Sequence, residues 1–290
     1  MTATPGPWTR AFARLRRDRA ATASAVFLAL LVCVCAGAGW VETPRADFKA
    51  IHLAGKLRPP SEAHWMGTDS LGRDVMARVL AGGRLSLGIG VVSACVALSL
   101  GVLYGAHAGW HGGRTDAAMM RFVDLVDSMP YMFLVIFLVS VFDRSLLLLF
   151  LALGATQWLN PARIVRAQVL SLRNADFVQA ARSLGARGPA IFARHLLPNL
   201  AGVVVVYLTL TIPRVILFES FLSFLGLGAR PPDEVSWGML MADGIRQVNP
   251  VDPRWWVIVF PGGVLAATLL ALNFLGDGLR DALDPRAERL

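Results

Sequence analysis

Long runs of apolar residues are the feature that most limits what this sequence can fold into. A helix needs about twenty apolar residues to cross a bilayer, and a backbone inside lipid must hydrogen-bond to itself. The chain has 290 residues, 55% of them hydrophobic, and a positive mean hydropathy of +0.55. We therefore expect an all-α integral membrane protein with about six spanning helices. The expected spans are residues 21–41, 85–108, 117–142, 146–159, 200–225 and 255–275.

The first apolar run has two interpretations. It follows an N-terminal segment that carries Arg10, Arg14, Arg16, Arg17 and Arg19. A cleavable signal peptide has the same layout, and Ala36-Gly37-Ala38 resembles its cleavage site. The run is longer than the ~7–15 apolar residues of a signal peptide. We therefore expect an uncleaved first span and keep the signal peptide as the alternative.

The distribution of basic residues predicts the orientation. The net charge is +8, and nearly all of the basic excess is arginine. Arginine is most abundant in residues 1–20, 107–121, 161–199 and 276–290, and basic residues favour the cytoplasmic side. We therefore expect both termini and residues 161–199 to be cytoplasmic. No polar domain interleaves arginine with exposed aromatic residues, so the expected partner of this charge is membrane lipid and not nucleic acid.

Residues 174–199 form a polar, basic island between apolar runs. Phe177, Ala180, Ala181 and Leu184 fall at helical spacing and predict one apolar face. Gly185 is suited to end that helix, because glycine tolerates the left-handed conformation of a sharp stop. A second short helix is expected after the Gly188-Pro189 turn and is predicted to close before Pro198. The apolar face needs either the base of its own bundle or a partner protein.

This island resembles the EAA loop of the membrane subunits of ATP-binding-cassette (ABC) importers. That motif is E-A-A, three residues, glycine, and a stretch ending in H-x-x-P-N. Gln179, where the family usually has glutamate, departs from it, so a neutral hydrogen bond would replace any ion pair. The resemblance implies the type I importer permease fold and docking of this segment, which we call the coupling segment, on an ATPase. The residues implied in that coupling are Val178, Gln179, Ala180, Ala181, Leu184, Gly185, His195, Pro198 and Asn199.

Further motifs resemble the peptide- and nickel-importing branch of these permeases. They are the G-T-D-x-x-G-R-D run at 67–74 and stretches at 112–120, 158–172, 203–228, 236–238 and 273–286, most similar to the second permease subunit of oligopeptide importers. Without the resemblance, the 67–74 run would be an ordinary capped surface loop. The resemblance implies half of a peptide pore in the bacterial inner membrane. Dipeptide, nickel or metal-chelate and glutathione importers remain alternatives.

The resemblance also implies the partners and the division of the chain. The partners are a sister permease in a heterodimer, two ATPase subunits and an extracytoplasmic substrate-binding protein. We expect an N-terminal tail, first span and loop over residues 1–82. A permease core is expected over 83–280, with the coupling segment at 174–199, and a cytoplasmic tail over 281–290.

The sequence contains no P-loop of its own. A Walker A motif needs glycine, four residues, then Gly-Lys and Ser or Thr. The single Gly-Lys pair, Gly55-Lys56, is followed by Leu57 and has Ala50 in the place of the first glycine. We therefore expect a non-catalytic subunit without a cofactor, with ATP and Mg²⁺ bound by partner ATPases. A secondary transporter is the alternative from another class, but it predicts internal repeats, and no convincing repeat is present. A membrane-embedded hydrolase would need a catalytic constellation that we do not find.

Several polar residues fall within or beside the expected spans. Arg214 and Glu219 are candidates to line the pore, because charges inside a membrane face the bundle interior or water. The alternatives for Arg214 are an ion pair with Glu219, an ion pair with the sister chain, or a position at the interface. Asp124 and Asp127 are expected to pair with Arg121 or Arg114.

Histidine and cysteine do not predict a metal site. His107 and His111 have the spacing of a helical metal pair, but nearby glycines argue against a helix there and no third ligand is close. Cys33, Cys35 and Cys95 lie in apolar runs and are expected to be small buried residues.

Overall fold

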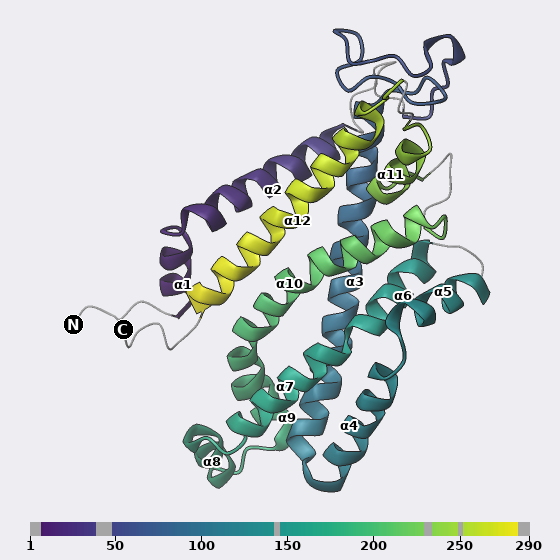
Figure 1. The fold of residues 1–290 in the computed structure, drawn as a ribbon. Helices are drawn as coiled ribbons and strands as arrows, with labels where there is room; N and C mark the ends of the chain where they lie inside the picture. Colours follow the sequence, from purple (N-terminus) through teal and green to yellow (C-terminus); the bar gives the residue numbers. More distant parts are fainter. Residues whose placement is uncertain (1–6, 39–47, 142–145, 229–233, 249–251, 284–290) are drawn as a thin grey trace.

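The structure, a computed structural model, describes residues 7–38, 48–141, 146–228, 234–248 and 252–283. These residues are mostly helical and contain no strand, which confirms the expected all-α class. The helices (Figure 1) are α1 (Pro7–Leu15), α2 (Arg19–Gly37), η1 (Leu53–Gly55), α3 (Val75–His111), α4 (Gly113–Asp127), α5 (Tyr131–Val141), α6 (Leu146–Gln157), α7 (Leu159–Leu172), α8 (Asp176–Ser183), α9 (Gly188–Ile191), η2 (Phe192–Leu196), α10 (Leu197–Phe224), α11 (Trp237–Ile245) and α12 (Trp256–Leu283).

Within the described residues, 4 helical runs are long and apolar enough to cross a membrane. They are α2, α3, the run Gly188–Phe224 that contains α9, η2 and α10, and α12. The expected third span is instead a pair of shorter helices, α4 and α5, whereas the expected fourth span is almost entirely α6. Met129 and Pro130 separate α4 from α5, because proline has no N–H to continue a helix, and a turn at Trp158 separates α6 from α7. The apolar run over residues 117–142 therefore located the third span, but not the break within it.

Helix α3 is the axis of the bundle and runs nearly the length of the molecule (Figure 1). Gly101, Gly105 and Gly109 recur once per helical turn on the face that packs against α7. A methyl group added at Gly101 would meet Pro161 Cβ at 2.6 Å, and one at Gly109 would meet the Arg166 carbonyl oxygen at 2.8 Å. Small residues at such positions let two backbones approach closely.

The close packing against α7 keeps Gly109 inside a regular helix. The expectation that the glycines near His107 and His111 prevent a helix there is therefore wrong. Gly112, with a φ of +67°, is the residue between α3 and α4.

Three hydrophobic clusters follow α3 from one end to the other. The first joins α2, α11 and α12 to the start of α3, around Trp237, whose Nε1 donates to the Val79 carbonyl at 2.9 Å. The second joins α5, α6 and α10 around Ile89, and the third joins α7, α8, α9 and the start of α10 around Val169. Each end of α3 thus has its own set of supporting helices.

Several segments expected to be irregular are helical. The basic N-terminal tail contains α1, and the loop expected over 226–254 contains α11, which Ser236 caps by accepting a hydrogen bond from the Met239 N–H. Helix α3 begins at Val75, inside the loop expected over 42–83. Asp74 stabilises that start by accepting a hydrogen bond from the Ala77 N–H at 2.9 Å.

The segments predicted to share one side of the membrane lie toward one end of the molecule. Figure 1 shows α1, the end of α12, the start of α10 and α8 toward that end, and residues 48–74 with α11 toward the other. Which end faces the cytoplasm stays a prediction, as do the divisions after residues 82 and 280. Residues 284–290 of the predicted tail, which include the end of the 273–286 motif, lie outside the described residues.

The expectation that all three cysteines are buried is wrong. Cys35 is buried, but Cys33 and Cys95 are exposed on the surface of this chain. They lie on spanning helices, where apolar surface faces lipid or a partner, so an apolar run does not imply burial within the chain.

Candidate functional site

The coupling segment packs one face of α8 against the bundle. Val178 and Ala181, three residues apart, are buried in the third hydrophobic cluster with Ile191, Leu196 and Leu200. These partners come from α9, η2 and α10. The bundle therefore fixes the position of α8 from one side.

The stripe of α8 next to this buried face is apolar and exposed. Phe177 is 41% exposed and Leu184, just after the helix, is 88% exposed. Gln179 and Ala180 are also exposed. The single apolar face expected from the sequence is thus divided, with Ala181 turned to the bundle and Phe177, Ala180 and Leu184 turned away. We call these three residues the α8 outer face.

Gly185 ends α8 as expected. Its φ is +82°, in the left-handed region that glycine occupies without strain. The Gly185 N–H donates to the Arg182 carbonyl at 2.9 Å, and the Ala186 N–H donates to the Ala181 carbonyl at 3.0 Å. These two bonds form a Schellman motif, which satisfies the last carbonyls of the helix. A methyl group on Gly185 would meet no other atom within 4 Å, so the turn projects from the chain.

The end of the coupling segment differs from the prediction, because the helix does not close before Pro198. The chain passes from α9 through η2, a π-helical turn, directly into α10, and Pro198 lies in the first turn of α10. Proline cannot donate the usual helical hydrogen bond, and the wider turn before it has the Leu197 N–H donating to the Phe192 carbonyl. Asn199 Nδ2 donates to the His195 carbonyl at 2.7 Å. The side chain of Asn199 is thus tied to the backbone of His195 one turn earlier.

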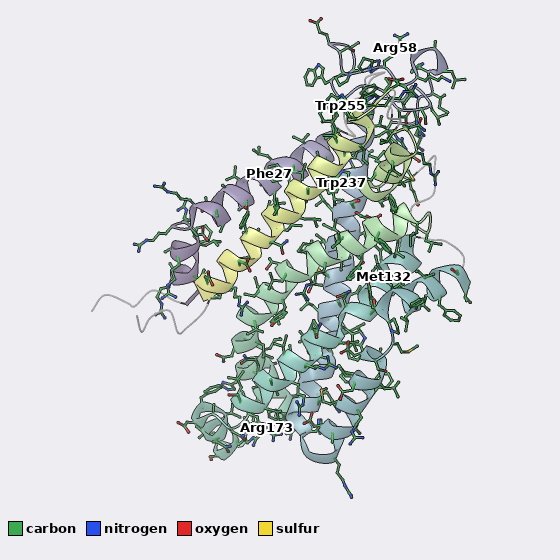
Figure 2. All side chains as sticks on the ribbon, in the orientation of Figure 1. Phe27, Arg58, Met132, Arg173, Trp237 and Trp255 are labelled. Atoms are coloured by element: carbon green, nitrogen blue, oxygen red, sulfur yellow. The ribbon has the colours of Figure 1, made fainter. Side chains whose placement is uncertain are left out.

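Side chains from α3 and α7 hold the coupling segment in place. The Arg182 guanidinium lies 5.0 Å from the centre of the Trp110 ring, a cation–π contact between α8 and α3. Arg173 Nη1 donates to the carbonyls of Gly109 and Trp110 and so caps the end of α3, near the lower end of the molecule in Figure 2. The position of α8 is therefore tied to the end of α3.

Ion pairs between α4 and α7 lie beside this site. Arg163 donates to Asp124 and Asp127 at 2.9 Å each, and these hydrogen bonds raise the pKa of its guanidinium. Arg166 pairs with Asp116 through two nitrogens. The expected pairing of Asp124 and Asp127 is confirmed, but their partner is Arg163 on α7 and not Arg121 or Arg114, because the chain turns back after α4.

The two candidate pore residues face different environments. Arg214 is exposed, whereas Glu219 is fully buried and accepts hydrogen bonds from Ser86 Oγ at 3.1 Å and Ser223 Oγ at 2.6 Å. Ser86 Oγ also accepts a hydrogen bond from the Trp237 N–H, so Glu219 links α3, α10 and α11. The alternative of an Arg214–Glu219 ion pair is wrong, because the two side chains lie on different faces of α10. A pore-lining role stays a prediction for Arg214, and in this conformation Glu219 lies inside the bundle.

The G-T-D-x-x-G-R-D run forms a buried charged cluster at the other end of the molecule. Asp69 accepts hydrogen bonds from Arg73 Nε at 2.7 Å and Arg78 Nη1 at 2.6 Å, and all three side chains are buried. Arg78 also pairs with Asp243 of α11 at 3.3 Å. We call these four residues the Asp69 cluster. An ordinary surface loop would expose its charges, so the resemblance was the better guide here.

Sequence reasoning missed most of the partners in these clusters. Arg163 and Arg166 recur at a spacing of three on one face of α7, which was a usable signal. Ser86, Arg78 and Trp237 carry no local signal, because they meet their partners across more than a hundred residues or across a turn.

No group of three or more potential metal ligands occurs among the described residues. His107 and His111 lie on regular helix, contrary to the expectation, with ring centres 4.2 Å apart.

Comparisons with known proteins identify the kind of chain that carries this site. Residues 97–289 match the family model described as the binding-protein-dependent transport system inner membrane component. Residues 6–60 match a model for the N-terminal transmembrane domain of oligopeptide transport permease C. Together the two matches extend over most of the sequence.

Curated relatives match nearly end to end. The chain is 44% identical to the oligopeptide transport system permease protein OppC of Haemophilus influenzae, over 96% of this chain and 88% of the relative. It is 45% identical to OppC of Escherichia coli K12, over 96% and 91%. It is 41% identical to the dipeptide transport system permease protein DppC of Bacillus subtilis, over 96% and 86%.

The fold also matches a solved transporter. A structure of the MetNI methionine ABC transporter in inward-facing conformations superposes with a TM-score of 0.56 at 18% identity. The match covers 72% of this chain and 97% of that chain. At this identity the likeness is one of fold.

Proposed function

The chain belongs to the family of binding-protein-dependent transport system inner membrane components, and from this premise we propose how its parts work. It is a multi-pass membrane permease subunit of an ABC importer for peptides. We propose that it forms half of a pore with a sister permease in the bacterial inner membrane, with both termini in the cytoplasm. Oligopeptides are the proposed substrate because the relatives at 44% and 45% identity are named for them.

The α8 outer face is the proposed contact with one of two ATPase subunits. Leu184 and Phe177 are exposed apolar side chains beside an open turn at Gly185, while Val178 and Ala181 anchor the same helix to α9 and α10. A push on this face would therefore reach α10 through the third hydrophobic cluster. His195, Pro198 and Asn199 lie along that path, and Gln179 is exposed beside the face. The exposure of Leu184 and Phe177 is the single observation that carries the proposal.

ATP and Mg²⁺ belong, in this proposal, to the ATPase partners, and the chain itself catalyses no reaction. An extracytoplasmic binding protein would deliver substrate at the end that carries residues 48–74. Arg214 is the proposed pore-lining cation, since its charge lies on an exposed face of α10. A peptide carboxylate or a residue of the sister chain would satisfy it.

Uptake by cells that lack this chain, with and without the restored gene, tests the function. Labelled di-, tri- and pentapeptides and nickel are offered in parallel. Restored uptake of the longer peptides supports the proposal, and restored uptake of nickel or dipeptide alone favours the alternatives within this branch. Uptake that survives ATP depletion but stops when an ionophore collapses the proton gradient would indicate a secondary transporter.

A further inference from the structure

A hollow of about 370 Å³ lies between the last turns of α3 and the turn that contains α9 and η2. Leu103, Ala106, Trp110, Pro189 and Phe192 give it a mostly apolar lining, and His107 and His111 lie at its edge. We call it the α3–α9 hollow. It is beside α8 but separate from the α8 outer face.

The exposed side chains along this part of α3 change from apolar to polar in order. Leu100, Leu103, His107 and His111 recur at spacings of three and four, so they share one helix face. All four are exposed, Leu103 by 66%. An occupant of this face would need an apolar part beside the leucines and a polar part beside the histidines.

Two arginines lie beside residues that line the hollow. Arg182 is exposed, stacks on Trp110 and forms no ion pair with any residue in the described ranges. Arg187 is the residue before α9 and is also exposed. Tryptophan is enriched at the level of lipid headgroups, so Trp110 suits the boundary between the two halves. Cationic side chains therefore lie beside Trp110 and Gly188 of the hollow.

We propose that the α3–α9 hollow binds one anionic phospholipid. An acyl chain lies along Leu100 and Leu103, and the phosphate is held by Arg182 with His107 and His111. The order of apolar and polar groups along α3 matches the order of tail and headgroup in a lipid leaflet, and anionic lipids attract arginine near the membrane surface. Because Arg182 belongs to α8, the bound lipid would touch the coupling segment itself.

Native mass spectrometry of the assembled complex measures the affinity of the α3–α9 hollow for phospholipids. Phosphatidylglycerol and phosphatidylcholine with the same acyl chains are titrated separately, with millimolar inorganic phosphate as a competitor. We expect phosphatidylglycerol to bind more tightly than phosphatidylcholine. Free phosphate should not displace it, because the acyl chain also contributes to binding. Arg182→Gln should weaken phosphatidylglycerol binding about fivefold, roughly what one cation contributes near an anionic surface. Arg17→Gln, an exposed arginine after α1, is the matched control and should have no such effect. Equal affinity for the two lipids, or equal loss in both variants, overturns the proposal.

A photo-crosslinker locates the occupant. p-Benzoylphenylalanine at Leu103, an exposed position, is irradiated in the assembled complex in phosphatidylglycerol-containing membranes. Attachment of phospholipid to the peptide that contains residue 103, reduced by Arg182→Gln, supports the site. Attachment to a sister permease or an ATPase subunit would show that a protein covers the hollow, and this result would overturn the proposal. A probe that reacts with no lipid would overturn it equally.

Discussion

The two ends of this molecule use their motif residues in opposite ways. At one end, the Asp69 cluster pairs its charges within the chain and buries three of its four side chains. At the other end, the α8 outer face exposes Phe177 and Leu184, and Gly185 forms an open turn. Both ends carry motifs typical of the family. The charges of the Asp69 cluster find their partners within the chain, whereas the α8 outer face is left uncovered by the chain.

This difference separates a role in folding from a role in assembly. A buried charge without its partner is costly, so the Asp69 cluster must form whenever the chain folds. An exposed apolar face adds nothing to the stability of the isolated chain, and it stabilises a complex when a partner covers it. Substitutions at the two ends should therefore affect different measurements.

The largest expected effect on stability is at Asp69. Asp69→Asn leaves the buried Arg73 without its carboxylate and Arg78 with Asp243 alone, and should lower the free energy of unfolding in mild detergent by about 3–5 kcal/mol. Asp252→Asn is the matched control, because it breaks an exposed pair with Arg254 and should cost about 0–1 kcal/mol. Similar losses at the two positions would mean that the cluster does not stabilise its end of the fold.

The opposite pattern is expected at Leu184. Leu184→Asp should leave unfolding unchanged, because the side chain is 88% exposed, and should reduce peptide uptake at least roughly tenfold, since an unpaired charge would be buried against the ATPase. Leu184→Ala should have a smaller effect. Ala181→Glu is a poorer test, because Ala181 is buried in the bundle and the variant would also unfold. Normal uptake by Leu184→Asp would show that this face is not a docking surface.

A smaller effect is expected at Gly185. Gly185→Ala forces a methyl group into the left-handed region and should destabilise the end of α8 by about 1–2 kcal/mol. Hydrogen exchange of the amides from Leu184 to Ala186 measures this loss directly. Gly185→Asn is the control, because asparagine tolerates this conformation better. Equal exchange rates in both variants would contradict the strain.

The smallest expected effect is at Arg163. Arg163→Gln breaks pairs with two exposed aspartates and should cost about 0.2–1 kcal/mol of unfolding free energy. Arg166→Gln should cost more, because its partner Asp116 is buried and would be left unpaired. Thermal unfolding of both variants in the same detergent compares them. A larger loss of unfolding free energy for Arg163→Gln than for Arg166→Gln would contradict the greater importance of the buried pair.

The sequence predicted the elements that depend on local pattern. Long apolar runs placed the spanning segments, and Gly185 predicted the helix end that the Schellman motif provides. It missed α11, because a helix of 9 residues between prolines has too few turns for a clear period. It also placed the start of α3 ten residues late, since Arg78 and Arg84 look like loop residues until their buried partners are known.

The candidate site was predictable in its location and not in its orientation. Spacing put Phe177, Ala181 and Leu184 on one face, but a helix of 8 residues can bury either of two neighbouring stripes. The third hydrophobic cluster decides between them by packing Val178 and Ala181. Glu219 was likewise placed in the correct helix, while its three-helix environment required contacts distant in sequence.

The most direct test of the central proposal is a photo-crosslink from the α8 outer face. p-Benzoylphenylalanine is placed at Leu184 or, as the matched position at the other end, at Trp65, which is 70% exposed. Both variants are irradiated in native membranes under conditions of peptide uptake. We predict that the probe at Leu184 attaches to an ATPase subunit and that the probe at Trp65 does not. Continued peptide uptake without any ATPase attachment at Leu184 would contradict the assignment of α8 as the coupling surface.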